Sequence, residues 1–562
     1  MEYWSRLPNE IRHMIWVIVA ENCTYDPSRP SVRAGYAAVD QQWQRYFEPL
    51  IFSAIVVDND RVHDMNEIIT KHPVRRKAVK HIWLKVKLAE YDCGESEVPE
   101  SAETKKLNEI YLTDTLWNLL SVMAAWRRPR PGLYRGILEE GITLDIAVFS
   151  PSDCKHTFRD FRLCPDYPLQ SRDPALMDFV VSPAKFLRTH RHSRKTFGLK
   201  EPVDDHDCRG WNRVPVLGES IGAIARITGE RPLNLDFSDF SFHSERRFPE
   251  LPVVSQLVLR RQFYRSVAPN VLSKLLDESF TCLTAFSHEQ FPDGFGGHNH
   301  GIFGTDYVDF LCGHRRRGEI FPAPNLGRTE RGSPLPKSLT ALIVFQDSDL
   351  RLGHRGRAIC LDFPNTEAIC DSLRCLDLQK IALSHIVSAE GFLADYTIPK
   401  LQSGFLHQTI SQVSNRCMFV WPELKHIALT SDTFANHPGH LSSVVDLAVK
   451  MLIALEFMPK VEIFEIWSEN KDNRLVLQFL RAPGGPGCIT LLGEQPIGMS
   501  VILGVQSALD TVFNNAEGPI PALTVSGGIG RDMLDHHALR CMVLEPISAF
   551  QREVERHARR NA

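Results

Sequence analysis

The sequence lacks the features that would place it in a membrane, on nucleic acid or among disulfide-stapled domains. It has 13 cysteines in 562 residues but no C-x-x-C pair, so neither a disulfide framework nor a paired-cysteine zinc site is indicated. Its longest apolar stretches, such as residues 14–20, are far shorter than the ~18 residues of a membrane helix. Lys and Arg (64) nearly balance Asp and Glu (68), whereas nucleic-acid binders usually carry a basic excess. We therefore expect an intracellular protein, cytoplasmic or nuclear, with no membrane or nucleic-acid partner.

Most catalytic motifs are also missing. The chain contains no P-loop, no G-x-G-x-x-G fingerprint, no H-E-x-x-H pair and no set of kinase motifs. Hydrophobic residues make up 43% and charged residues 23%, as in an ordinary folded domain. A long folded chain without such motifs favours a recognition protein that needs no cofactor and no metal over an enzyme.

One enzyme motif does match. Gly218-Glu219-Ser220-Ile221-Gly222 fits G-x-S-x-G and lies between an apolar stretch and a helical one, the context of a hydrolase nucleophile. Against a hydrolase, Pro215 interrupts the strand that would precede the serine, and a central strand needs its backbone N–H groups. No oxyanion loop and no series of parallel strands is evident upstream. A serine hydrolase is therefore only a remote alternative.

A histidine-rich run raises the possibility of a metal site. Zinc ligands usually come in pairs with short, regular spacing, whereas here the paired residues are one residue apart and lie among glycines. We interpret the run as a polar loop, so no metal ligand is assigned. Its members are His288, His298, His300, Cys312 and His314.

The N-terminal region carries the most specific signal. Leu7 and Pro8 precede a helical stripe of Ile11, Met14 and Ile15, and Pro suits the first turn of a helix. A second helical stretch, residues 32–47, contains Trp43 and Phe47, and a strand is expected over 52–57.

This pattern resembles an F-box, a short helical bundle that docks on a Skp-type adaptor and through it on a cullin–RING ubiquitin ligase. Two features depart from the family. Asp40 stands where a Cys is usual, and the loop 25–33 is long and contains prolines. The resemblance implies adaptor docking by Leu7, Pro8, Ile11 and Ile15, with Trp43 and Phe47 supporting the bundle.

The rest of the chain is similar to fungal F-box-like proteins with a long C-terminal region of unknown function. The matching stretches span about residues 79–480 and include 79–84, 257–262, 335–339, 421–424 and 458–462. This resemblance implies a fold and names no catalytic residue.

One apolar pattern recurs in this long region, an apolar residue followed three and five positions later by two more. Leucine-rich repeats use this spacing at each strand, but they repeat every ~20–29 residues, and here the gaps are longer and uneven. The body is therefore expected to be an irregular leucine-rich-repeat-like structure, with an ordinary α/β sheet as the alternative. The pattern occurs at Val254/Leu257/Leu259, Leu339/Leu342/Val344, Leu373/Leu376/Leu378, Leu424/Ile427/Leu429 and Val461/Phe464/Ile466.

The expected fold is mixed α/β, an F-box-like helical bundle followed by the leucine-rich-repeat-like body. We expect an F-box-like domain over 1–53, a first α/β segment over 54–149, an irregular insertion over 150–213, an α/β domain over 214–545 with a loop at 291–336, and a polar C-terminal helix over 546–562.

The sequence thus predicts a non-catalytic substrate-recognition subunit of a cullin–RING ubiquitin ligase. Its partners would be the Skp-type adaptor and a target protein that the sequence does not identify. The alternative is an F-box-like interaction or scaffold protein that has no association with a ligase.

Overall fold

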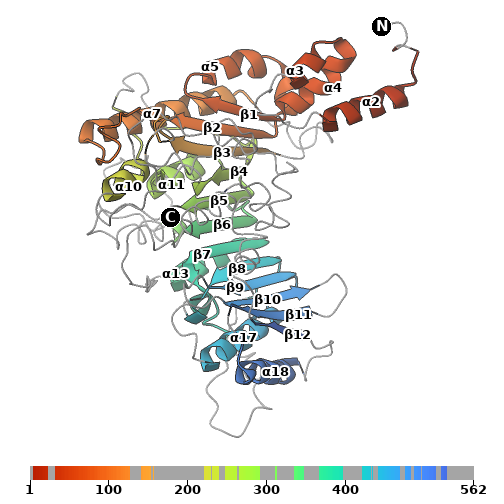
Figure 1. The fold of residues 1–562 in the computed structure, drawn as a ribbon, viewed down its shortest axis with the longest axis vertical. Helices are drawn as coiled ribbons and strands as arrows, with labels where there is room; N and C mark the ends of the chain where they lie inside the picture. Colours follow the sequence, from red (N-terminus) through yellow and green to blue (C-terminus); the bar gives the residue numbers. More distant parts are fainter. Residues whose placement is uncertain are drawn as a thin grey trace, which may run out of the picture.

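The short aliphatic stretches of the chain form the strands of one large sheet, and the amphipathic stretches between them form helices. The computed structural model describes residues 4, 6–22, 32–126, 141–153, 156, 220–229, 231–238, 247–261, 265–290, 310–312, 335–346, 366–396, 420–431, 433–434, 441–468, 475–481, 487–494, 496–513, 521–527 and 548. All structural statements below concern these residues. The protein is mixed α/β, and its strands stack along the long axis of the molecule (Figure 1).

The sheet has 12 strands among the described residues, and their order in the sheet follows their order in the chain. Neighbours from β1 to β9 are parallel, β10 is antiparallel to β9 and β11, and β12 is parallel to β11. The strands are β1 (Ala54–Asp58), β2 (His81–Lys87), β3 (Ile142–Phe149), β4 (Val254–Leu259), β5 (Ala285–Gln290), β6 (Ala341–Gln346), β7 (Lys380–Ser388), β8 (His426–Thr430), β9 (Ile463–Trp467), β10 (Leu475–Arg481), β11 (Gly487–Gly493) and β12 (Ala522–Ser526).

The connecting helices pack on one face of this sheet, which we name the helix face. Parallel crossovers are right-handed in nearly all proteins, so strands that never reverse their order send successive helices to the same side. One continuous core cluster joins the helices to the strands from Val57 to Leu509. The helices after β1 are α5 (Val62–Met65), the π-helical turn η1 (Asn66–Thr70), α6 (Pro73–Ala78), α7 (Ala102–Met123), α10 (Ser220–Thr228), α11 (Pro269–Glu278), α13 (Thr366–Arg374), α14 (Ala389–Phe392), α17 (Leu441–Glu456) and α18 (Met499–Phe513).

The other side of the sheet, which we name the opposite face, carries more polar side chains. Successive side chains of a strand point to opposite sides, so residues in register across the strands form rows. One row contains Trp83, Asp145, Val258, Ser287, Ile343, Ala382, Ala428, Glu465 and Gln478. A separate apolar cluster of six buried residues, including Phe345 and Trp467, lies on this face.

The entry to several strands repeats one hydrogen-bond arrangement. A backbone carbonyl just before a strand accepts two N–H groups from the chain that enters the next strand. For example, the Thr340 carbonyl accepts from Gln379 N (2.7 Å) and Lys380 N (3.0 Å). The other carbonyls that do this belong to Ser53, Thr284, Gln379 and Lys425.

A fully buried aliphatic residue precedes each strand that is entered in this way. It is the first position of the apolar pattern, and the next two positions point from the strand into the core of the helix face. These first positions are Val79, Leu339, Leu378, Leu424 and Val461.

The structure corrects one of the five expected pattern positions. Leu373 is in α13, and β7 begins only at Lys380, so Leu373/Leu376/Leu378 does not mark a strand. The strand pattern is instead Leu378/Ile381/Leu383, five residues later. The error arose because an amphipathic helix also places apolar residues three apart on its buried face.

The alternation of apolar and polar residues over 81–88 predicts a strand with one exposed face, but the structure buries both faces of β2. Trp83 and Lys85 point away from the helix face, yet both are buried. The Lys85 ammonium lies over the rings of Trp83 (5.4 Å) and Phe149 (5.5 Å), so the aliphatic and aromatic parts of these side chains cover one another.

The expected N-terminal helix corresponds to α2 (Asn9–Asn22), and the expected helix over 32–47 divides into α3 (Val32–Ala37) and α4 (Gln41–Phe52). Among the described residues, no helix is both long and apolar enough to cross a bilayer. Most of the expected insertion 150–213, the loop 291–336 and the C-terminal helix lie outside the described residues.

The burial of two leucines predicts how strongly their substitution by alanine changes the free energy of unfolding. Leu342 on β6 is fully buried, whereas Leu503 on α18 is 62% exposed. We expect Leu342→Ala to lower the free energy of unfolding by roughly 2–5 kcal/mol, because it leaves a cavity in the core. Leu503→Ala should change it by less than about 0.5 kcal/mol. Urea unfolding measures both, and equal transition midpoints would contradict the assignment of Leu342 to the core.

Candidate functional site

The N-terminal helices are held together by aromatic rings. Trp43 and Phe47 on α4 stack with an interplanar angle of 10° and ring centroids 5.6 Å apart. Tyr36 of α3 stacks on both rings, and Trp16 of α2 meets Trp43 edge-on at 6.4 Å. Such pairs contribute about 0.5–1.5 kcal/mol each beyond the burial of their area. Two of the residues that the F-box resemblance named as supports, Trp43 and Phe47, therefore lie at the centre of this aromatic cluster.

Asp40 explains why α4 begins where it does. Its Oδ1 accepts hydrogen bonds from Gln42 N (2.6 Å) and Trp43 N (2.9 Å), so it is the N-cap of α4. The residue that departs from the F-box pattern thus has a structural role here. Arg12 of α2 donates to Gln42 Oε1 at 2.8 Å and ties the first helix to this same turn.

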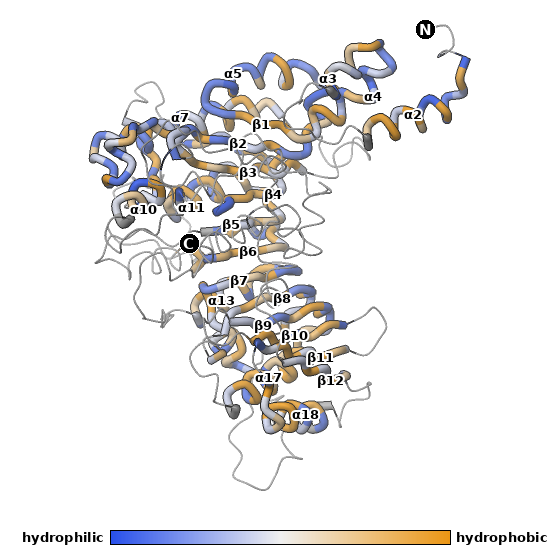
Figure 2. The backbone as a smooth tube through the Cα atoms, in the orientation of Figure 1, coloured by the Kyte–Doolittle hydropathy of each residue, from blue (hydrophilic) through white to orange (hydrophobic). Residues whose placement is uncertain are grey.

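The outer side of α2 presents a row of apolar side chains. Ile11, Met14 and Ile18 are 41%, 56% and 52% exposed, and their spacing places them on one side of the helix. Leu7 and Ile15 are half-buried, and Pro8 is exposed. We name Leu7, Pro8, Ile11, Met14 and Ile18 the α2 stripe. Figure 2 shows that hydrophobic and hydrophilic segments alternate along α2, which lies at the N-terminal end of the molecule.

The N-terminal helices are joined to the sheet through α4 and α6. Arg75 of α6 donates to Glu48 Oε1 through Nε (3.0 Å) and Nη2 (2.7 Å), and its guanidinium lies 5.1 Å from the ring centroid of Phe52. α4 also packs against β1. The α2 stripe is therefore carried by a unit that is anchored to the first strand.

The other sequence candidates do not come together. Ser220 is the first residue of α10, and residues 157–219, with Pro215 and Gly218, lie outside the described residues. Parallel strands β1 to β3 do precede Ser220, so one argument against a hydrolase was wrong.

His288 is a core residue rather than a loop residue. It lies on β5 in register with Leu259 and Val344, at a position where the other strands place aliphatic side chains toward the helices. Burial lowers the pKa of His288 to about 3, so the ring is neutral. Cys312 packs against the core, and His298, His300 and His314 lie outside the described residues. No cluster of three potential metal ligands occurs in the part of the chain that the structure describes.

Sequence reasoning missed a buried polar cluster made by Asp145 on β3 and by residues that follow β2 and β4. Arg260 Nε lies 2.7 Å from Asp145 Oδ2, and Arg265 Nη2 lies 2.5 Å from Glu100 Oε2. All four side chains are at most 7% exposed. Removing one partner from such a pair leaves a buried charge and typically costs 3–5 kcal/mol. The pairs join residues more than 100 positions apart, so no local pattern reveals them.

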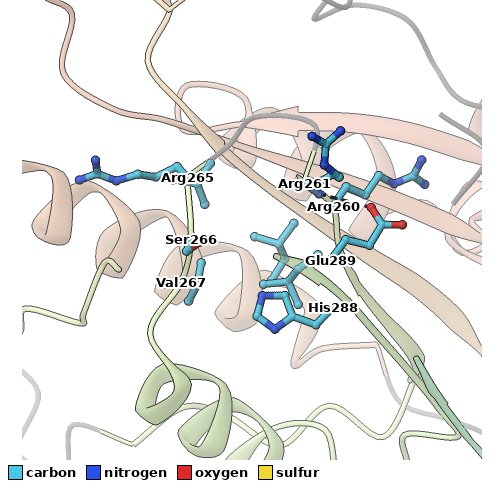
Figure 3. Close-up of a pocket in the computed structure, with 10 residues that line it drawn as sticks. Arg260, Arg261, Arg265, Ser266, Val267, His288 and Glu289 are labelled. Atoms are coloured by element: carbon cyan, nitrogen blue, oxygen red, sulfur yellow. Dashed lines mark hydrogen bonds between the residues drawn. The ribbon is translucent and has the colours of Figure 1, made fainter. Parts of the chain in front are cut away.

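A small cavity lies within this cluster (Figure 3). His288 points into the region beside Val267, Glu289 lies next to Arg260, and Arg265 points away toward Glu100. Its volume is about 10 Å³, which is room for one water molecule. A cavity of this size is too small for a substrate.

A second buried carboxylate lies on the opposite face. Glu465 on β9 is 1% exposed, and its Oε1 accepts a hydrogen bond from Gln478. Its Oε2 has no hydrogen-bond partner among the described residues. Burial raises the pKa of Glu465 to about 7.

Comparison with known proteins gives one match. Residues 334–513, about a third of the chain, match a family described as a family of unknown function (DUF6546). This range covers β6 to β11 with helices α13 to α18. No curated protein and no solved structure matches the chain.

The raised pKa of Glu465 predicts a pH-dependent stability. Between about pH 4.5 and 7 the folded protein keeps a proton that the unfolded chain has lost, so the free energy of unfolding falls as the pH rises through this window. Because glutamine is always neutral, Glu465→Gln should raise the free energy of unfolding by roughly 1–3 kcal/mol at pH 8 and change it little at pH 5.

Urea unfolding at both pH values measures this difference, and Glu367→Gln, at an exposed position of α13, is the matched control. An effect of Glu465→Gln that is equal at pH 5 and pH 8 would contradict the titration.

Proposed function

We propose that the protein is a substrate-recognition subunit of a cullin–RING ubiquitin ligase. In this proposal the α2 stripe docks on a Skp-type adaptor, and the α/β body binds the target protein. The protein makes and breaks no bonds. It raises the effective concentration of target lysines near the ligase, as any bivalent tether does.

The observation that carries the proposal is the α2 stripe. Three large apolar side chains on one helix side are each more than 40% exposed, and a row of this kind suits helix docking in a hydrophobic groove. The stripe begins at the Leu7-Pro8 pair that the F-box resemblance assigns to adaptor docking. The aromatic cluster behind it holds α2 on α4, so the stripe has a rigid support.

The body is proposed to be a leucine-rich-repeat-like solenoid. Strand order that follows the chain, helices on one face, and the repeated carbonyl at the strand entries all support a stack of similar units. Long and uneven connections explain why the sequence period is irregular; one example is the 104 residues, 150 to 253, between β3 and β4. Solenoids of this kind bind other proteins along their extended surface.

Adaptor capture tests the proposal. Immobilised protein should retain a purified Skp-type adaptor, and Leu7→Ala combined with Pro8→Ala should weaken binding at least tenfold, because the truncated side chains no longer fill the groove of the adaptor. Ile11→Ala alone should weaken binding by a smaller factor. Binding constants come from calorimetry or biolayer interferometry.

Met499→Ala combined with Leu503→Ala is the matched control, because both residues are exposed apolar side chains of another helix, α18. Equal affinity of the wild type and the Leu7/Pro8 variant would overturn the docking surface. An adaptor that does not bind the wild type would favour the scaffold alternative.

A further inference from the structure

Two neighbouring strand ends bring a cysteine and a histidine together. Cys93 follows β2 and His156 follows β3, and the carboxyl ends of these parallel strands lie at the same edge of the sheet. Cys93 Sγ lies 3.5 Å from His156 Nδ1, within hydrogen-bond distance for sulfur. The two residues are 63 positions apart, and neither belongs to the α2 stripe or to the cavity.

The contacts of the imidazole determine which nitrogen carries the proton. His156 Nε2 lies 3.3 Å from the Tyr91 carbonyl oxygen, and a carbonyl can only accept a hydrogen bond. Nε2 therefore donates, which leaves Nδ1 as the acceptor that faces the Cys93 thiol. This is the tautomer that a general base for a thiol requires.

The ring is also held in place from the side. The rings of His156 and Tyr91 pack with centroids 5.3 Å apart, and the Arg226 guanidinium lies 4.5 Å from the Tyr91 ring. The Tyr91 hydroxyl donates to Asp153 Oδ1 at 2.9 Å. Burial raises the pKa of Asp153 to about 7. The charged groups around Tyr91 are therefore Asp153 and Arg226, which contact it, and Glu95, whose carboxylate is 3.4 Å from Arg226.

Cys93 and His156 differ in their exposure to solvent. Cys93 is exposed, whereas His156 is 4% exposed. A solvent-accessible thiol beside a buried, oriented base is the arrangement of reactive cysteines, and buried cysteines are inert. Two other cysteines of the protein serve as references, one buried and one exposed. Cys370 is buried, which raises its pKa to about 12, and Cys375 is exposed with Sγ 3.5 Å from the Asp371 carbonyl.

We propose that Cys93 is a covalent modification site, a thiol activated by His156 that reacts with small electrophiles, among them hydroperoxides. The thiol proton moves to His156 Nδ1, and the sulfur attacks one peroxide oxygen. The S–O bond forms as the O–O bond breaks, which oxidises sulfur by two electrons to a sulfenic acid and reduces the peroxide. The departing hydroxide or alkoxide takes the proton from His156 and leaves as water or an alcohol.

Competitive labelling of the full chain tests the site. The protein is treated with limiting iodoacetamide at pH 6.5, and the alkylation of Cys93, Cys375 and Cys370 is followed by peptide mass spectrometry. Cys93 should react about tenfold faster than Cys375, and Cys370 should not react while the protein is folded. Hydrogen peroxide followed by a sulfenic-acid probe should mark Cys93 ahead of Cys375.

His156→Gln should bring the rate at Cys93 down to that at Cys375, and His426→Gln, a change of a histidine on β8, should leave the ratio unchanged. Because Cys370 reports unfolding in each sample, a variant that exposes it is set aside, and the wild-type ratio decides alone. Equal rates at Cys93 and Cys375 in the wild type, or an unchanged ratio in a folded His156→Gln protein, would overturn the proposal.

Discussion

The structure depends on the parallel hydrogen-bond ladder and on the way each turn of the chain enters it. At several strands one carbonyl accepts two N–H groups from the next turn, while the preceding aliphatic side chain is fully buried. These two constraints fix where each new strand lies in the sheet and how it is rotated relative to the strand before it. Since every strand adds to the same edge, the helices collect on one face, and the core extends without interruption from β1 to α18.

The ladder has two ends, and an unpaired strand edge is prone to pair with other chains. The first edge is met by α4, which packs on β1 and is fixed to α6 by the contacts of Arg75 with Glu48 and Phe52. The N-terminal helices therefore cap the first edge of the sheet. The proposed docking unit and the cap are the same helices, so the α2 stripe is carried by the part of the chain that also completes the sheet.

Local apolar patterns in the sequence located several strands, but they did not identify the neighbouring helix or the polar residue in the core. The apolar spacing located β4, β6, β8 and β9 because each strand must bury alternate residues. It failed at Leu373, since a helix face produces the same spacing. It also assigned His288 to a polar loop, although this residue replaces an aliphatic side chain in the core ladder. A period count cannot recognise a polar residue at a core position.

The polar sites were outside the reach of such patterns for a different reason. Asp145 meets Arg260, Glu100 meets Arg265, and Cys93 meets His156, and the two members of each pair come from different turns of the chain. Only the order of the strands places these residues together, and strand order is a property of the whole sheet. By contrast, the α2 stripe and the cap at Asp40 are built within one helix or turn, so the sequence alone could suggest them.

The length of the sheet also sets the distance between two partners that bind at different strands. Neighbouring strands are about 4.8 Å apart, so 12 strands span roughly 50 Å from the N-terminal cap to β12. In the proposed function, a target bound near the last strands would lie far from an adaptor on α2, and one bound near β2 to β4 would lie close to it. Because the core is continuous, this separation is rigid, and a rigid spacer gives a high effective concentration only at the distance it matches. The position of a target along the sheet would therefore determine which of its lysines the ligase could reach.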